Sequence, residues 1–88
     1  MTRREVTIHN KLGIHARPAS RIVKLATLSR ADFWLVKNGE RVNGKSILSV
    51  MMLAAACGER VILEANGEGE AELIQEVADL IQKKFGEE

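Results

Sequence analysis

The sequence predicts an α+β fold, a two-layer sandwich in which three amphipathic helices pack on a four-stranded sheet. Four short segments have the β-forming residues, or the polar–apolar alternation, of strands that bury one face. Three longer segments repeat apolar residues at the spacing of an amphipathic helix. The predicted order is β-α-β-β-α-β-α, and 88 residues leave room for one domain, residues 1–88, with one core.

The first strand is predicted over residues 5–9, where polar and apolar side chains alternate. The first helix is predicted over residues 15–28, because apolar residues follow Ala19 at helical spacing. Pro18 lies in the first turn of this helix, where a missing N–H is tolerated. His9 falls within the first strand without an acidic or cysteine neighbour in the sequence, so we assign it no specific role.

A β-hairpin is predicted next. Residues 32–37 are rich in β-forming side chains, and Asn38-Gly39 is the strongest hairpin-turn signal in the chain. Residues 40–43 then form the short return strand.

The second helix is predicted over residues 47–56, with Ser46 as its N-cap and Gly58 as its left-handed stop. A fourth strand follows over residues 60–65. The last helix is predicted from about residue 69 to residue 85, because its apolar residues repeat at helical spacing. Arg3, Arg4 and residues 86–88 are expected to be loose ends.

Composition excludes several classes of function. The formal net charge is +1, so the chain lacks the overall basic field expected of a nucleic-acid-binding protein. Cys57 is the only cysteine, which excludes an intramolecular disulfide and a multi-cysteine metal site, and its apolar neighbours predict a small buried side chain. No signal-peptide core follows the first residues, and no apolar run could span a bilayer. We therefore expect a cytoplasmic protein without membrane insertion, and we predict no metal site.

The most informative stretch is Gly13-Ile14-His15-Ala16-Arg17-Pro18-Ala19, which puts a histidine at the start of a helix. The first N–H groups of a helix have no partner within it, and the helix dipole is positive at this end, so an anion binds readily there. The same dipole favours a neutral imidazole for His15, whose nitrogen is then nucleophilic. Arg17 adds a permanent cation with a fork of donors suited to phosphate oxygens. These groups together fit reversible phosphorylation of a histidine.

This stretch is similar to the active-site motif of the HPr family, the histidine-containing phosphocarriers of the phosphoenolpyruvate-dependent phosphotransferase system. Element order and length match that family over essentially the whole chain. Lys45-Ser46-Ile47-Leu48, followed by Val50, Met51 and Leu53, also resembles the regulatory-serine segment of the family. The resemblance implies an open-faced sandwich, with an antiparallel sheet covered on one side by the helices.

By the same resemblance, His15 accepts a phosphoryl group through Nδ1 from phosphorylated enzyme I and passes it to enzyme IIA domains during sugar uptake. Arg17 is implied to stabilise the phosphate, and Ser46 to be the target of a serine kinase/phosphorylase in some lineages. The implied protein is a carrier with a covalent phosphohistidine rather than a stand-alone catalyst, and it needs no cofactor. Asn10-Lys11-Leu12-Gly13 is instead similar to the nitrogen-related paralogue of HPr, which keeps a regulatory role open as the alternative.

Two surfaces are candidates for partner binding. The exposed side of the first helix carries Ser20, Arg21 and Lys24 beside Arg17, and these cations could steer an acidic partner or simply be solvated. In the second helix, Val50, Leu53, Ala54 and Cys57 are expected to supply the buried stripe. The remaining apolar side chains would then form a docking patch, although a fully buried helix would also fit. The patch comprises Ile47, Leu48, Met51 and Met52.

Overall fold

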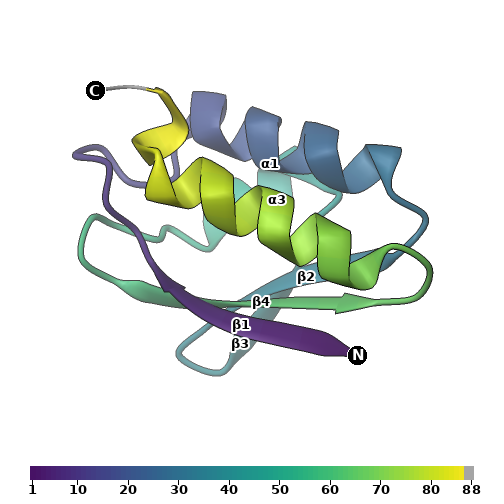
Figure 1. Ribbon diagram of the computed structural model, residues 1–88. Coiled ribbons are helices and arrows are strands. Elements are labelled where there is room, and N and C mark those ends of the chain that lie inside the picture. Colours follow the sequence, from purple (N-terminus) through teal and green to yellow (C-terminus); the bar gives the residue numbers. More distant parts are fainter. Residues whose placement is uncertain (87–88) are drawn as a thin grey trace.

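All the helices lie on one face of an antiparallel sheet, and the other face is open (Figure 1). The computed structural model describes residues 1–86. The sheet contains four strands in the order β1-β4-β2-β3. They are β1 (Thr2–Thr7), β4 (Arg60–Asn66), β2 (Asp32–Lys37) and β3 (Glu40–Asn43). The predicted α+β sandwich is therefore confirmed, as is the antiparallel, one-sided arrangement that the family resemblance implied.

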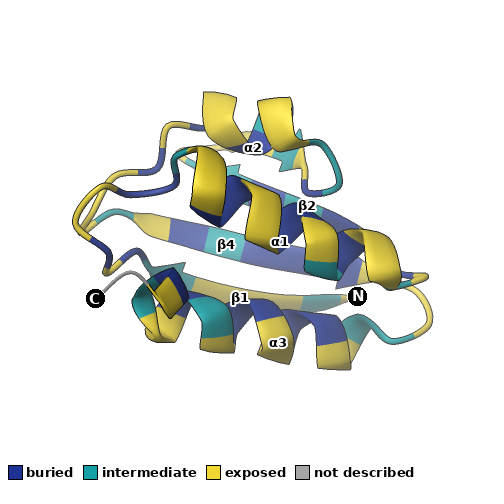
Figure 2. Ribbon diagram, turned by 90° about the horizontal axis from the view of Figure 1, so that it is seen from above, coloured by how far each residue is buried: buried dark blue, intermediate teal, exposed yellow. Residues whose placement is uncertain are grey.

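The long helices α1 (Ala16–Leu28) and α3 (Glu70–Gln82) lie side by side across the sheet, and the short α2 (Ile47–Met52) lies on the far side of α1 (Figure 2). Both long helices turn a buried stripe toward the sheet, as their spacing predicted. Ile22 and Val77 from these stripes are fully buried and belong to the same core cluster as Leu63 of β4. This packing fixes the start of α1 close to α2 at one end of the molecule (Figure 2).

Strand β1 starts earlier and ends earlier than predicted, so the expectation that Arg3 and Arg4 are loose is wrong. Arg3 pairs with the nearly buried carboxylate of Glu64 on β4 at 2.8 Å, on the open face of the sheet. Arg4 points to the helix side, where it donates to Gln75 of α3 at 3.2 Å. Arg3 and Arg4 therefore lie on opposite faces of this strand, and each has a partner that is distant in the sequence. His9 is exposed and lies beyond the end of the strand.

Helix α2 is shorter than predicted, because it ends at Met52 rather than near residue 56. The chain leaves the helix through Ala54, which has a positive φ of 54°. Gly58 also has a positive φ, of 90°, but it lies in the following loop and does not stop the helix. Ala54 and Cys57 are exposed, so the predicted buried stripe is reduced to Val50 and Leu53. The prediction of a buried cysteine is wrong for the same reason.

Helix α3 ends at Gln82, and a turn of 3-10 helix, Lys84–Gly86, follows it. The predicted continuous helix to residue 85 is therefore interrupted. Phe85, with a positive φ of 57°, is nonetheless fully buried and fills the core at this end. The expected loose residues 87–88 lie outside the described residues.

Candidate functional site

His15 is the N-cap residue of α1, as the sequence predicted. Its backbone is extended, and its carbonyl oxygen accepts the N–H of Ala19 at 3.0 Å. Its half-buried side chain makes no capping hydrogen bond to the helix. Pro18 carries no N–H, so the first-turn donors that lack a partner within the helix are those of Ala16 and Arg17. The imidazole therefore lies at the end of the helix where an anion is favoured.

A network of hydrogen bonds shapes the loop before His15. The side-chain amide of Asn10, which is fully buried, donates to the carbonyl of Gly13 at 2.6 Å. The N–H of Gly13 donates back to the carbonyl of Asn10 at 3.1 Å. Ile14 then donates to the carbonyl of Ala55, in the loop after α2, at 2.9 Å. The residue next to the histidine is thus tied to a segment distant in sequence.

Glycine is required at position 13 for two reasons. Its φ of +69° lies in the left-handed region, which side chains with a Cβ rarely adopt. A Cβ at this position would also lie 2.5 Å from the carbonyl oxygen of Ala55 and 2.9 Å from Cα of Ala56. The two loops therefore approach each other as closely as a glycine allows.

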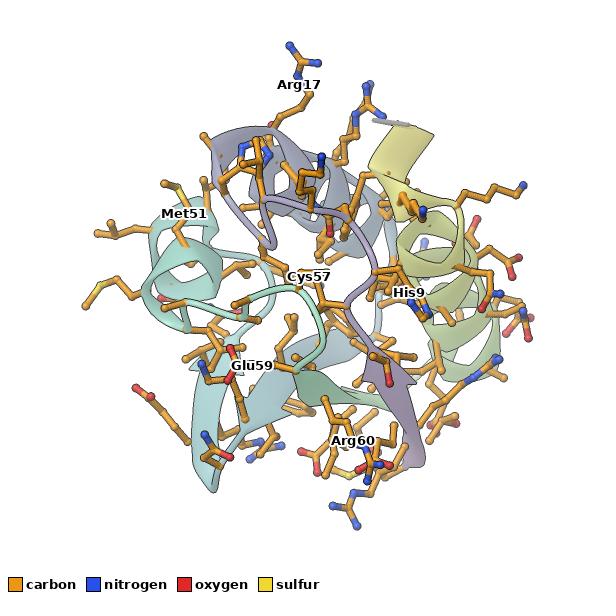
Figure 3. The ribbon with its side chains drawn as sticks, turned by 90° about the vertical axis from the view of Figure 1, so that its left-hand side faces the viewer. His9, Arg17, Met51, Cys57, Glu59 and Arg60 are labelled. Atoms are coloured by element: carbon orange, nitrogen blue, oxygen red, sulfur yellow. The ribbon has the colours of Figure 1, made fainter. Side chains whose placement is uncertain are left out.

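The cations predicted along α1 have different surroundings. Arg17 is exposed and extends away from the ribbon into solvent (Figure 3). Arg21 is exposed as well, but its guanidinium donates to the carbonyl of Phe85 in the C-terminal turn. Ser20 and Lys24 are exposed. The basic side of the helix is therefore accessible, with one of its cations tethered.

Helix α2 presents the predicted apolar patch to solvent. Ser46 is its N-cap, and the Ser46 hydroxyl accepts the N–H of Ser49 at 3.2 Å. The side chains of the patch are 38 to 70% exposed; they are Ile47, Leu48, Met51 and Met52. Helix α2 contacts α1, and Met51 and Arg17 project from neighbouring parts of the surface (Figure 3).

Two carboxylates have pKa values lowered by their surroundings. The backbone N–H of Ala56 and the ammonium of Lys37 lower the pKa of Glu59. The hydroxyl of Thr2 lowers the pKa of Glu70, together with the N–H of Gly67. Within residues 1–86, no group of three His, Cys, Asp or Glu side chains is placed to hold a metal ion.

The sequence reasoning missed the residues that hold the loop before His15. Asn10 and Gly13 have the spacing of the first and fourth residues of a β-turn, positions that favour asparagine and glycine, and this signal could have been recognised. Ala55 and Lys37 carry no such local signal, because their partners Ile14 and Glu59 are distant from them in the sequence.

Taken together, the open-faced sandwich and the helix that begins at a histidine define a small protein that presents the imidazole of His15 at a helix N-terminus. Residues 2–83 match the family model described as the PTS HPr component phosphorylation site. The chain belongs to the HPr family of phosphocarrier proteins of the phosphotransferase system.

Named relatives agree with this assignment. The phosphocarrier protein HPr of Neisseria meningitidis serogroup A is 45% identical over 87 residues, which cover 99% of this chain and 98% of the relative. The HPr-like protein Crh of Bacillus subtilis is 38% identical over 84 residues, covering 96% of this chain and 99% of Crh. Among solved structures, HPr-C-His from Thermoanaerobacter tengcongensis superposes with a TM-score of 0.96 at 42% identity, covering 100% of this chain and 99% of that one.

In the part of the chain that the structure describes, no helix is long and apolar enough to cross a membrane.

Proposed function

We propose that this protein carries phosphoryl groups on His15, which accepts them from phosphorylated enzyme I and passes them to enzyme IIA domains. The observation that carries the proposal is the position of the imidazole at the N-cap of α1, where the helix end favours an anion. Membership of the HPr family gives the reaction class and the kind of partner.

When His15 is loaded, the lone pair of one of its ring nitrogens attacks phosphorus, and the bond from phosphorus to the donor histidine breaks. In the onward transfer the acceptor histidine attacks phosphorus, and the bond from phosphorus to the His15 nitrogen breaks. The phosphate that arrives on His15 is close to the N–H groups of Ala16 and Arg17. These donors act without reorganisation, because the helix holds them in place. The phosphoryl group then passes directly to the histidine of the next protein, so this protein needs no substrate pocket of its own.

Arg17 is proposed to stabilise the phosphate. Its guanidinium extends into solvent (Figure 3), so it is accessible to a phosphoryl group arriving with a partner. A planar guanidinium can make two hydrogen bonds to phosphate oxygens at once. Ser20, Arg21 and Lys24 line the same exposed side of α1 and are proposed to contact an acidic partner.

The exposed patch on α2 is proposed as the apolar part of the docking surface. Leu48 and Met52 are 68% and 70% exposed, which is unfavourable unless a partner covers them. Methionine side chains adapt to different contact surfaces, and a carrier must dock to at least a donor and an acceptor.

Ser46 is proposed as a regulatory phosphorylation site for a serine kinase/phosphorylase. A phosphate there would meet the N–H groups at the start of α2, so it need not unfold the helix. It would place a dianion beside Ile47 and Leu48, which a partner must desolvate. The expected consequence is weaker docking with unchanged stability.

A regulatory role in the nitrogen-related branch is the second candidate, favoured by the run Asn10-Lys11-Leu12-Gly13 before the histidine. In that role partners read the phosphorylation state of the protein, and sugar uptake is incidental. Rates of phosphorylation by enzyme I of the sugar branch and by its nitrogen-branch counterpart, measured on the same protein, distinguish the two roles.

The direct test is incubation with phosphoenolpyruvate and a cognate enzyme I. Phosphate is expected on His15 as an acid-labile phosphoramidate, and it is expected to be absent in His15→Ala. His9→Ala is the matched control, because His9 is also exposed but lies outside the helix N-terminus. Acid-stable phosphate, or phosphate that is lost in His9→Ala, would contradict the proposal.

A further inference from the structure

An ion pair that is distant from His15 in the sequence stabilises the loop after α2, which the residues before His15 contact. The ammonium of Lys37, at the end of β2, lies 3.2 Å from the carboxylate of Glu59. The Lys37 side chain is only 16% exposed, so its charge is poorly solvated and depends on its partners. Glu59 lies on the loop between α2 and β4, below the start of α1 (Figure 3).

The two side chains of the pair hydrogen-bond the backbone on both sides of Ala55. Lys37 donates to the carbonyl of Ala54 at 3.0 Å, and the carboxylate of Glu59 accepts the N–H of Ala56 at 2.7 Å. Ala54 has a positive φ of 54°, a strained conformation for a non-glycine residue, and the bonds from Lys37 and Glu59 help to hold the segment in it. Ala55 itself is buried and has little freedom between its two held neighbours.

Ala55 is the residue that the histidine loop touches. Its carbonyl accepts the N–H of Ile14 at 2.9 Å, one residue before His15. The same oxygen is where a Cβ on Gly13 would collide, at 2.5 Å. A displacement of the Ala55 carbonyl therefore also displaces the N-cap of α1, because Gly13 and Ile14 are packed directly against this carbonyl.

We propose that Lys37 and Glu59 are positioning residues for phosphoryl transfer, which hold the 54–56 segment so that Ile14 and His15 keep the geometry that the reaction requires. The proposal rests on the function proposed for His15. The pair bonds to Ala54 and Ala56, on either side of Ala55, so its effect on His15 is exerted through the Ala55 carbonyl. Misplacing a reacting group by about 1 Å can cost about 100-fold in rate.

The test compares Glu59→Ala with Glu68→Ala. Glu68 also forms an ion pair, with Arg30 at 3.7 Å, but both side chains are largely exposed and lie at the other end of α1. Phosphorylation by enzyme I at 25 °C is expected to fall about 10-fold to 100-fold in Glu59→Ala, mainly in kcat, and to be unchanged in Glu68→Ala. Glu59→Gln keeps an oxygen for the Ala56 N–H and is expected to recover most of the rate.

Hydrogen exchange of the Ile14 amide supplies a readout that does not depend on enzyme I. It is expected to speed up in Glu59→Ala, whereas amides in α3 keep wild-type protection. A wild-type rate in Glu59→Ala, or a rate loss that only follows the fraction unfolded, overturns the proposal. If Glu59→Ala does not fold, Lys37→Met is compared in the same way, because it keeps the apolar stem and removes both donated bonds. Failure of the wild type to accept phosphate contradicts the proposed function instead, and the Ile14 exchange then still decides whether the pair positions the loop.

Discussion

Replacing Gly13 by alanine tests how the loop that carries His15 is held. Two separate costs follow from the structure. Alanine must adopt the left-handed φ of +69°, which costs about 1–2 kcal/mol. Its Cβ must also fit 2.5 Å from the Ala55 carbonyl oxygen, which is backbone and cannot rotate away as a side chain would. Overpacking of this kind costs about 1–3 kcal/mol.

The two costs add to roughly 2–5 kcal/mol of lost unfolding free energy. A loss of 1 kcal/mol lowers the melting temperature of a domain of this size by about 4–8 °C, so Gly13→Ala should melt roughly 8–40 °C below wild type. Circular dichroism on heating measures the difference. Gly39→Ala is the matched control, because Gly39 has a similar φ of +81° with nothing within 4 Å of its Cβ position. It should lose only the left-handed cost of about 1–2 kcal/mol.

The comparison isolates the close approach between the two loops. Equal melting temperatures for Gly13→Ala and Gly39→Ala would refute the reasoning, because only the backbone conformation would then matter. Gly13→Ala should also slow phosphorylation at temperatures where it is folded, since the Ile14–Ala55 bond of 2.9 Å has to lengthen.

Changes at four further residues have expected outcomes. Arg17→Ala should keep the melting temperature and slow phosphorylation about 10²–10³-fold, measured in the enzyme I assay, and an unchanged rate would leave Arg17 only a solvated residue. Leu48→Glu should weaken binding of enzyme I in a titration, whereas Leu28→Glu, 79% exposed at the far end of α1, should not. Ser46→Asp should slow transfer without lowering the melting temperature, and Ser46→Ala should lose about 1 kcal/mol as a cap; equal transfer rates for Ser46→Asp and wild type would leave Ser46 only a cap. The pKa of Glu70 is lowered by its hydrogen bonds in the folded protein, so its stabilisation is present above its ordinary pKa of 4.5 and is lost as pH falls through the folded value. The melting temperature of Glu70→Gln should therefore fall less than that of wild type as the pH is lowered below 4.5.

Much of the fold could be read from the sequence because local chemistry encodes it. Asn38-Gly39 predicts the hairpin turn, since both residues adopt the positive φ that such a turn requires. Ser46 predicts the start of α2 through a bond made within its own helix. Pro18 and the apolar spacing that follows it predict where α1 begins, and with it the place of His15.

The errors lie where a residue depends on partners distant in the sequence. Arg3 belongs to a strand because its backbone pairs with the neighbouring strand β4, where Glu64 lies opposite it. Helix α2 ends at Met52, and the segment that follows it bonds to Lys37, which is distant in the sequence, while Cys57 is exposed. No local pattern carries that information.

The candidate site divides in the same way. The sequence by itself determined the chemical groups of the site, a histidine and an arginine at the N-terminus of a helix, because their identity and spacing are local properties. Only the tertiary structure decided how the histidine is held, through the contact of Ile14 and Gly13 with Ala55. It also decided that Arg21 is tethered to the C-terminal turn while Arg17 reaches into solvent. The physical reason is that orientation depends on hydrogen bonds and close approaches between loops, which form only when the helices pack on the sheet and bring those loops together.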